Sequence, residues 1–130
     1  MGVLDNLVPE KVFYYFEELC NIPHGSKNTK AISDYCVNFA KERGLAYHQD
    51  ASNNIIILKN GSKGYEDSKP VIIQGHLDMV CEKEKGCTID FEKDGLDLAI
   101  DGDYIYAKGT TLGGDDGIAV AMALAILDDD

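Results

Sequence analysis

Basic residues are scarce in this chain of 130 residues, which has 12 lysines and arginines against 23 aspartates and glutamates. The formal net charge is −11, and a surface of that sign repels phosphate groups. The charge therefore argues against nucleic acid and against anionic membrane surfaces as partners, but it permits the binding of metal cations. The hydrophobic fraction of 45% is sufficient for the packed core of one ordinary domain.

Membrane, targeting and disulfide signals are also missing. The opening residues lack the basic and apolar regions of a secretory signal, and no apolar run reaches the ~18 residues of a membrane span. The four cysteines form no C-x-x-C pair, which favours reduced thiols. There is no phosphate-binding loop and no nucleophile-elbow serine motif. We therefore expect a cytoplasmic protein without membrane partners.

Apolar spacing predicts three helices. The first follows Pro9 and ends before Pro23, whose ring cannot continue a helix. The second should begin at a cap on Ser26 or Asn28 and stop at Gly44. The third is predicted from the unbroken apolar run at 118–127, where alanine favours helix over strand.

The remaining patterns indicate strands. Residues 45–48 and 54–58 flank a polar turn, and residues 96–100 and 104–107 flank an Asp-Gly turn. The apolar run at 70–74 is typical of a buried strand. Together the elements predict the α/β class, with a mixed sheet and flanking helices.

The third helix is also the most hydrophobic, and the sequence stops just after it. A helix that is apolar all round must be covered on several sides. We therefore expect residues 1–130 to be a piece of a longer protein, or to depend on a partner.

The first candidate for chemistry is the histidine that follows the predicted strand at 70–74. His76 and Asp78 lie two positions apart, so a continuing strand would point both side chains to one side. A carboxylate behind an imidazole is the arrangement that orients a metal-bound histidine. The pattern is short and common, however, and the pair alone favours a histidine in a polar loop beside an unrelated aspartate.

The second candidate is the glycine-rich segment 109–117, which precedes the third helix. Asp115 and Asp116 stand between glycines there, which implies a tight backbone path. The two acids would serve as simple helix caps. A carboxylate held rigidly on such a turn would also bridge two cations, and carboxylate with imidazole suits Zn²⁺ or Mn²⁺.

Other polar groups give weaker signals. His24 is expected in an exposed loop, and His48 on a strand facing solvent or its hairpin partner. The alternating charges at 82–85 are typical of a solvated face. Asp101-Gly102-Asp103 lacks the spacing of a calcium loop, so we predict a turn.

Two long segments resemble one family. Residues 70–80 are similar to the first metal motif of the aminoacyl-histidine dipeptidases, and residues 101–119 to the second. These enzymes, also called Xaa-His dipeptidases, cytosol non-specific dipeptidases or peptidase D, belong to the zinc aminoacylase and carboxypeptidase superfamily. Gly114 and Asp116 stand where the family has alanine and asparagine. The resemblance runs through essentially the whole chain.

The resemblance implies a dinuclear-zinc exopeptidase catalytic domain with two divalent ions at a sheet edge, with Mn²⁺ or Co²⁺ as alternatives to Zn²⁺. His76 would bind one ion and Asp115 would bridge both. Asp78 would be the catalytic-site carboxylate that orients His76. The peptide bond between Asp115 and Asp116 would be cis.

The same resemblance implies hydrolysis of dipeptides, Xaa-His among them, by a water that the two ions share. A glutamate base, the other ligands and a lid domain would follow residue 130, so residues 1–130 would form the N-terminal portion of the catalytic domain and be inactive alone. For the full-length protein, a homodimer is a candidate assembly. Two alternatives stay open: a non-catalytic binding module of the same fold, and an acyl-amino-acid deacylase or carboxypeptidase of the same superfamily.

Overall fold

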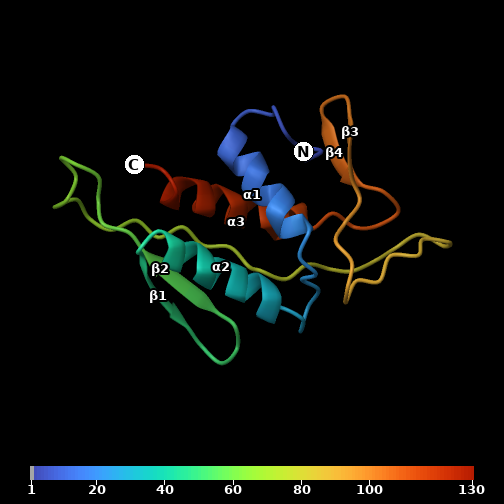
Figure 1. Cartoon of the computed structure of the whole chain (residues 1–130), viewed down its shortest axis with the longest axis horizontal. Helices are drawn as coiled ribbons and strands as arrows, with labels where there is room; N and C mark the ends of the chain where they lie inside the picture. Colours follow the sequence, from blue (N-terminus) through green and yellow to red (C-terminus); the bar gives the residue numbers. More distant parts are fainter. Residues whose placement is uncertain (1) are drawn as a thin grey trace.

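The computed structural model describes residues 2–130 as three helices and four short strands (Figure 1). In chain order these are α1 (Glu10–Cys20), α2 (Lys30–Glu42), β1 (Ala46–Gln49), β2 (Ile55–Leu58), β3 (Leu98–Asp101), β4 (Tyr104–Ala107) and α3 (Gly114–Leu127). The mixture of helices and small antiparallel sheets confirms the predicted α/β class.

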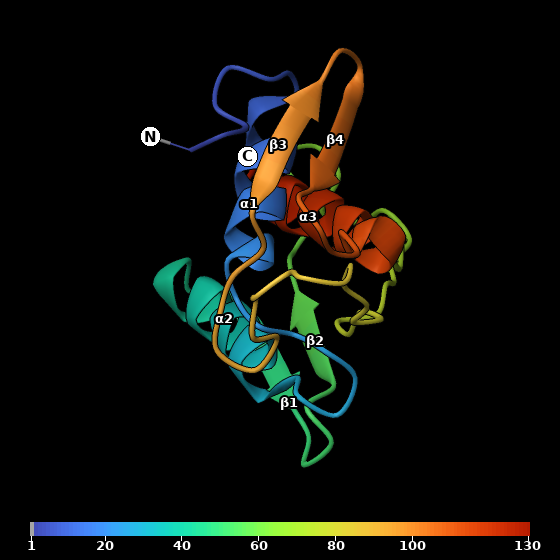
Figure 2. The same ribbon diagram turned by 90° about the vertical axis from the view of Figure 1, so that its right-hand side faces the viewer.

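The elements form three groups along the molecule (Figure 2). Helices α1 and α3 pack against each other in the middle, with the β3–β4 hairpin at one end. Helix α2 lies against the β1–β2 hairpin at the other end. The segment that carries the candidate site connects these groups, so the fold brings distant stretches of sequence together.

The α1–α3 contact forms the centre of the core. Phe16 and Leu19 of α1 are buried in the same apolar cluster as Ala121 and Leu124 of α3. A side chain at Gly117 would place its Cβ only 3.3 Å from the Phe16 ring. Glycine at the start of α3 therefore lets the two helices approach closely, which fixes where this helix begins relative to α1.

The boundaries of α2 partly match their prediction. The helix ends at Glu42, and Gly44 follows its C-cap with a φ of +67°, the left-handed conformation that glycine adopts most readily. The predicted caps at its start are wrong, because the residue before the first turn is Thr29 and not Ser26 or Asn28. Thr29 makes no side-chain cap bond, and the side chain of Ser26 is used elsewhere.

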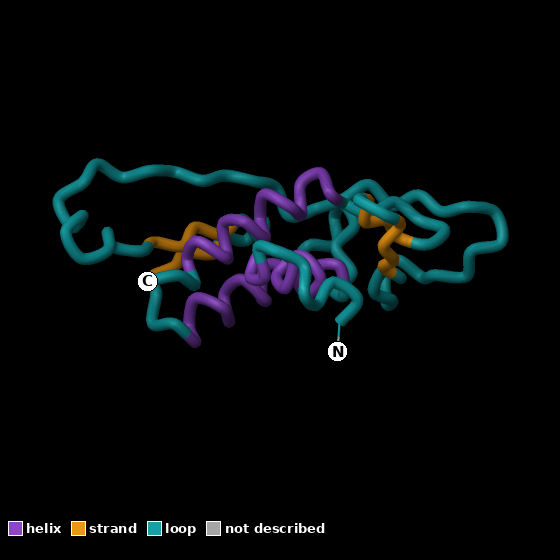
Figure 3. Tube along the Cα trace, turned by 90° about the horizontal axis from the view of Figure 1, so that it is seen from above, coloured by secondary structure: helices purple, strands orange, loops and turns teal. Residues whose placement is uncertain are grey.

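Both predicted hairpins are confirmed. Ala46 to Gln49 pair with Leu58 to Ile55, and Leu98 to Asp101 pair with Ala107 to Tyr104, both antiparallel. The strands stay apart as two separate sheets, coloured orange at opposite sides of Figure 3.

The predicted strand at 70–74 is wrong. The segment makes no strand pairing among residues 2–130, and Val71 and Ile72 are 85% and 89% exposed. A strand exists only when a neighbour pairs with its backbone, and neither hairpin lies alongside in register. The apolar character of the run was correctly identified, but its burial was not.

The apolar helix α3 is covered on one side only. Val120, Ala121 and Leu124 are buried, whereas Met122 and Ile126 on the opposite face are exposed. Among residues 2–130, no helix combines the length and the apolar character needed to cross a membrane.

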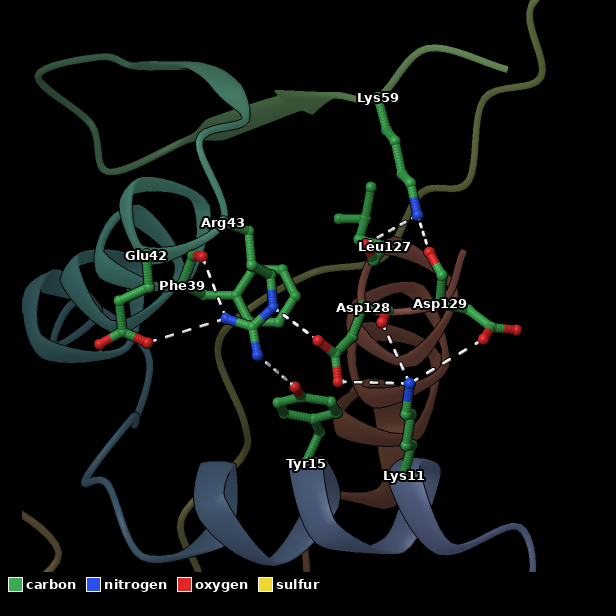
Figure 4. Close-up of polar contacts among 9 residues, drawn as sticks. All are labelled: Lys11, Tyr15, Phe39, Glu42, Arg43, Lys59, Leu127, Asp128 and Asp129. Atoms are coloured by element: carbon green, nitrogen blue, oxygen red, sulfur yellow. Dashed lines mark hydrogen bonds and ion pairs between the residues drawn. The ribbon is translucent and has the colours of Figure 1, made fainter. Parts of the chain in front are cut away.

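Polar contacts tie the end of α3 to the rest of the molecule (Figure 4). The Arg43 guanidinium donates to Asp128 at 2.7 Å, to the Tyr15 hydroxyl at 2.8 Å and to the Phe39 carbonyl at 3.1 Å. It also lies over the Phe39 ring, 3.8 Å from the centroid. Lys11 donates to the Asp128 carbonyl at 3.0 Å. Residues of α1, the end of α2 and the end of α3 therefore meet at one carboxylate.

Candidate metal centre

The two candidate segments meet in space. His76 Nε2 lies 3.0 Å from Asp115 Oδ1, although the residues are 39 positions apart. Both side chains are accessible, with exposed fractions of 52% for His76 and 94% for Asp115. The structure thus brings an imidazole and a carboxylate together at the surface, where a small ion would reach them.

Backbone contacts hold the His76 loop in place. The Met79 N–H donates to the His24 carbonyl at 3.0 Å, and the His76 N–H donates to Asp116 Oδ2 at 3.3 Å. A Cβ at Gly75 would come within 2.8 Å of that same Asp116 oxygen. Glycine before His76 therefore allows the loop to lie directly against the start of α3.

Asp115 sits on an irregular turn where α3 begins. Gly113 has a φ of +75°, and a Cβ there would also approach the Met79 sulfur to 2.9 Å. The dihedral angles of Asp115 and Asp116 are not helical, and the peptide bond between them is cis, as the family resemblance implied. The acids are therefore not ordinary first-turn residues, and the Asp115 side chain is directed to the loop with His76.

Asp78 lies behind the imidazole. Its Oδ1 is 3.0 Å from His76 Nδ1, and its Oδ2 accepts a 2.5 Å hydrogen bond from the Ser26 hydroxyl. The Ser26 bond is the main cause that lowers the Asp78 pKa, and His76 lowers it further. Asp78 is thus held as a carboxylate facing Nδ1, which leaves Nε2 directed to Asp115.

The electrostatics of His76 favour a positive charge between the side chains. The pKa of His76 is raised, chiefly by the hydrogen bond to Asp115 and further by the contacts with Asp78. Nδ1 lies 3.0 Å from both the carboxylate and the backbone carbonyl of Asp78, and Nε2 lies 3.0 Å from Asp115 Oδ1, so the gap between Nε2 and Asp115 favours a positive charge. A divalent cation in that gap would satisfy the same two groups, because neutral imidazole and carboxylate are ordinary zinc ligands.

The two donor atoms lie slightly closer together than two ligands of one zinc ion. Bonds of about 2.0–2.2 Å at tetrahedral angles put neighbouring ligand atoms roughly 3.4 Å apart, and Nε2 and Oδ1 are 3.0 Å apart. A small outward movement of the exposed Asp115 side chain closes that difference. Across residues 2–130, however, no set of three or more His, Cys, Asp or Glu side chains is arranged to hold an ion. The residues fit part of a zinc site, not a whole one.

The other histidines lie outside this arrangement. His24 was expected in an exposed loop, and this is wrong: its side chain is buried, only 4% of the residue is exposed, and its Nδ1 is 2.6 Å from the Ile22 carbonyl. It packs beneath the Gly113 turn, and burial lowers its pKa. His48 is exposed on β1, as predicted.

Sequence reasoning missed the role of Ser26 as a partner of Asp78. The two residues are 52 positions apart, and they meet because Gly25 and Met79 form an isolated parallel bridge. No local pattern indicates such a bridge. The sequence pattern indicated Ser26 only as a cap for the second helix.

An imidazole and a carboxylate that face each other at the surface are donor types of a zinc site, and they supply part of one. No family model matches the chain. The whole chain is 42% identical, over 130 residues, to the cytosol non-specific dipeptidase of Escherichia coli (strain K12), and spans 27% of that protein. The similarity to the aminoacyl-histidine dipeptidases is thereby confirmed.

A solved structure gives the same result. The aminoacylhistidine dipeptidase from Vibrio alginolyticus matches 99% of this chain with a TM-score of 0.94 and 38% sequence identity. The match spans 26% of that structure's chain. Both similar proteins are dipeptidases, and this chain spans about a quarter of the length of each.

Proposed function

We propose that the chain forms part of the catalytic domain of a metal-dependent dipeptidase, which hydrolyses Xaa-His and other dipeptides. The observation that carries the proposal is the 3.0 Å approach of His76 to Asp115, with Asp78 behind the imidazole. Similarity to two dipeptidases over essentially the full chain supports the substrate class. The name of the first relative also supports a location in the cytosol.

The three side chains would have different tasks. His76 would bind one ion through Nε2. Asp78 would accept a hydrogen bond from His76 Nδ1, which keeps the imidazole proton on Nδ1 and orients the ring. Asp115, whose side chain is 94% exposed, would hold the same ion and a second one through its carboxylate. The ions, Zn²⁺ or in its place Mn²⁺ or Co²⁺, would polarise the scissile carbonyl and lower the pKa of a bound water.

The remaining parts of the site would come from the three quarters of the relatives' length that this chain does not span. A catalytic zinc ion takes roughly three protein ligands and a water, and His76 with Asp115 supplies two. A general base is also needed to accept the proton of the water. We therefore propose that residues 1–130 alone turn over no substrate.

A hydrolysis assay tests both parts of the proposal. The full-length protein, stripped with a chelator and reloaded with Zn²⁺, Mn²⁺ or Co²⁺, is given Xaa-His and other dipeptides. N-acyl amino acids and longer peptides are tested in parallel. We expect cleavage of the dipeptides only, and no turnover by residues 1–130. Cleavage of acyl amino acids alone would point to a deacylase. Turnover by residues 1–130 would contradict the proposal that the other ligands and the general base lie outside these residues.

A further inference from the structure

Thr111 lies where the two segments that carry the candidate metal centre run side by side. Residues 82–84 follow the loop with His76, and residues 109–111 precede the turn with Asp115. Backbone hydrogen bonds of 2.8 and 2.9 Å join the two stretches as a short antiparallel ladder. Thr111 is the last residue of this ladder before the second segment turns toward α3.

The hydroxyl of Thr111 ends the ladder. A regular antiparallel pair exchanges two backbone bonds, and the Thr111 N–H does donate to the Glu82 carbonyl at 2.9 Å. The Glu82 N–H, however, donates to the Thr111 hydroxyl at 3.2 Å, while the Thr111 carbonyl accepts from the Thr110 hydroxyl at 2.9 Å. The Thr111 hydroxyl also donates to the Val80 carbonyl at 2.7 Å. One side chain therefore takes the place of the second backbone bond and binds the neighbouring segment at two points.

Two further contacts join the segments beyond the ladder. Gly113 lies directly against the Met79 side chain, and the His76 N–H donates to Asp116 Oδ2 at 3.3 Å. These contacts hold the far side of the turn, whereas the threonine hydroxyl fixes the point at which the turn begins. Asp115 lies between the two points of attachment, so its position depends on both.

The Val80 carbonyl and the Glu82 N–H would both lose a partner without the hydroxyl. Because Thr111 is partly exposed, water would take over these bonds, and it needs space between the two segments to do so. A functional site must be held within about 0.5 Å of its working geometry. A separation of that size at the start of the turn would therefore alter the approach of Asp115 to His76, while the other contacts keep the segments attached.

We propose that Thr111 is a positioning residue, whose hydroxyl sets the spacing of the two segments at which His76 and Asp115 together bind a divalent cation. The inference rests on the proposed function of the site. The effect is one of distance between the two ligands, and it needs no change in their protonation. Thr111 acts through the backbone of both segments and not by contact with the ion.

The test uses the full-length protein with four variants. Thr111→Val removes the hydroxyl at nearly unchanged volume. Thr111→Ala also removes it, and takes the place of the valine variant if that variant does not fold. Thr111→Ser keeps the hydroxyl. Thr88→Val is the matched control, because it makes the same change at an exposed threonine.

The first measurement is hydrogen exchange of backbone amides in the metal-free protein. The Glu82 N–H, which the hydroxyl accepts, should exchange at least about threefold faster in Thr111→Val. The Glu84 N–H, which donates to the Gly109 carbonyl at 2.8 Å, should exchange as in the wild type. The pair of rates shows that the ladder stays while the bond to the hydroxyl is lost.

The second measurement is metal binding, followed by calorimetry with Zn²⁺ and by absorption spectroscopy with Co²⁺, whose bands report the arrangement of its ligands. We expect Thr111→Val to bind Zn²⁺ about three- to tenfold more weakly, less than the roughly 10- to 100-fold typical when a direct partner of a ligand is lost. Its Co²⁺ spectrum should be shifted as well. Thr111→Ser should recover most of both effects, and Thr88→Val should match the wild type.

An unchanged Glu82 exchange rate or an unchanged Zn²⁺ affinity in Thr111→Val overturns the inference, and so does a serine variant as impaired as the valine variant. A wild type that binds Zn²⁺ but cleaves no dipeptide overturns the proposed function instead, since neither amide exchange nor metal titration depends on turnover. The two failures are therefore distinguishable.

Discussion

Both ends of α3 carry aspartates, but these differ in their contacts and in their exposure to solvent. At the far end, Asp128 receives the Arg43 guanidinium at 2.7 Å, and its side chain is 26% exposed. At the near end, Asp115 contacts the exposed His76 ring, and its own side chain is 94% exposed. The Asp128 carboxylate is therefore part of a hydrogen-bonded network, whereas the Asp115 carboxylate is accessible to solvent.

The helix dipole accounts for part of this difference. A negative charge is disfavoured at the C-terminal end of a helix, and the Asp128 carboxylate is compensated by two cations, Arg43 at 2.7 Å and Lys11 at 3.6 Å. Asp115 lies near the N-terminal end, where a carboxylate needs no such compensation. The comparison indicates that Asp128 stabilises the fold, and that Asp115 is available for chemistry.

The strongest test of the comparison is Asp115→Asn in the full-length protein. It removes the charge that would bridge two ions while keeping the size of the side chain. We expect dipeptide hydrolysis to fall by more than about 100-fold, beyond the usual cost of changing a residue that only supports a ligand. Urea unfolding should be unchanged within about 0.5 kcal/mol, because the side chain is exposed. Retained activity at wild-type metal affinity would remove Asp115 from the site.

Arg43→Ala should show the reverse pattern. The change removes hydrogen bonds to Asp128, Tyr15 and the Phe39 carbonyl, together with the stacking on the Phe39 ring. We expect a loss of about 2 kcal/mol in the free energy of unfolding, measured by urea titration, with Zn²⁺ affinity of the folded protein kept within about twofold.

Arg43→Lys is the control for that prediction. It keeps the positive charge but not the planar fork that reaches three partners, so its loss should be intermediate. Equal losses in Ala and Lys variants would show that geometry, not charge, stabilises this end. No loss in either variant would contradict the structural role assigned to Asp128.

The sequence predicted those parts of the molecule that local patterns determine. Helical spacing located α1 and α2, and turn residues located both hairpins, because neighbours along the chain decide those structures. The segment at 70–74 failed for the opposite reason. Its strand character depends on a paired neighbour, which no pattern within the segment can supply.

The candidate site divides in the same way. Family resemblance placed His76 and Asp115 in one site, and the structure brings them together; their role as ligands stays a prediction. The burial of His24 could not be predicted, because packing beneath the Gly113 turn determines it. Likewise, 85 positions separate Arg43 from Asp128, and nothing in either local sequence indicates the contact.

The pH dependence of stability should distinguish the two ends more finely. The hydrogen bond from Arg43, first among the causes, lowers the Asp128 pKa. The Asp128 carboxyl therefore binds a proton more weakly in the folded state than in the unfolded chain, where aspartates have a pKa of about 3.9. The stabilisation is present above that pH, and it is lost as the pH falls through the folded-state pKa.

We expect the wild type to be more stable than Asp128→Asn by about 1 kcal/mol or less at pH 7, the range of partly exposed ion pairs. That advantage should shrink steadily in urea titrations carried from about pH 5 toward pH 2. Comparison with the variant is needed because other acids also titrate there. An advantage independent of pH would mean that Asp128 stabilises through packing and not through its charge.

The smallest effect is expected at Asp116, where the dipeptidase family has asparagine. Asp116 Oδ2 accepts from the His76 N–H at 3.3 Å, and an asparagine carbonyl would accept the same bond. Asp116→Asn therefore keeps the contact that holds the loop and removes one negative charge near the centre. We expect Zn²⁺ affinity and dipeptide turnover to change by less than about threefold, since Asp116 is partly exposed and solvent and salt screen one such charge. Asp116→Ala, which also deletes the acceptor, should weaken Zn²⁺ binding more. If the asparagine variant were as impaired as the alanine variant, the charge of Asp116 would be part of the site, and the open end of α3 would hold two functional carboxylates in place of one.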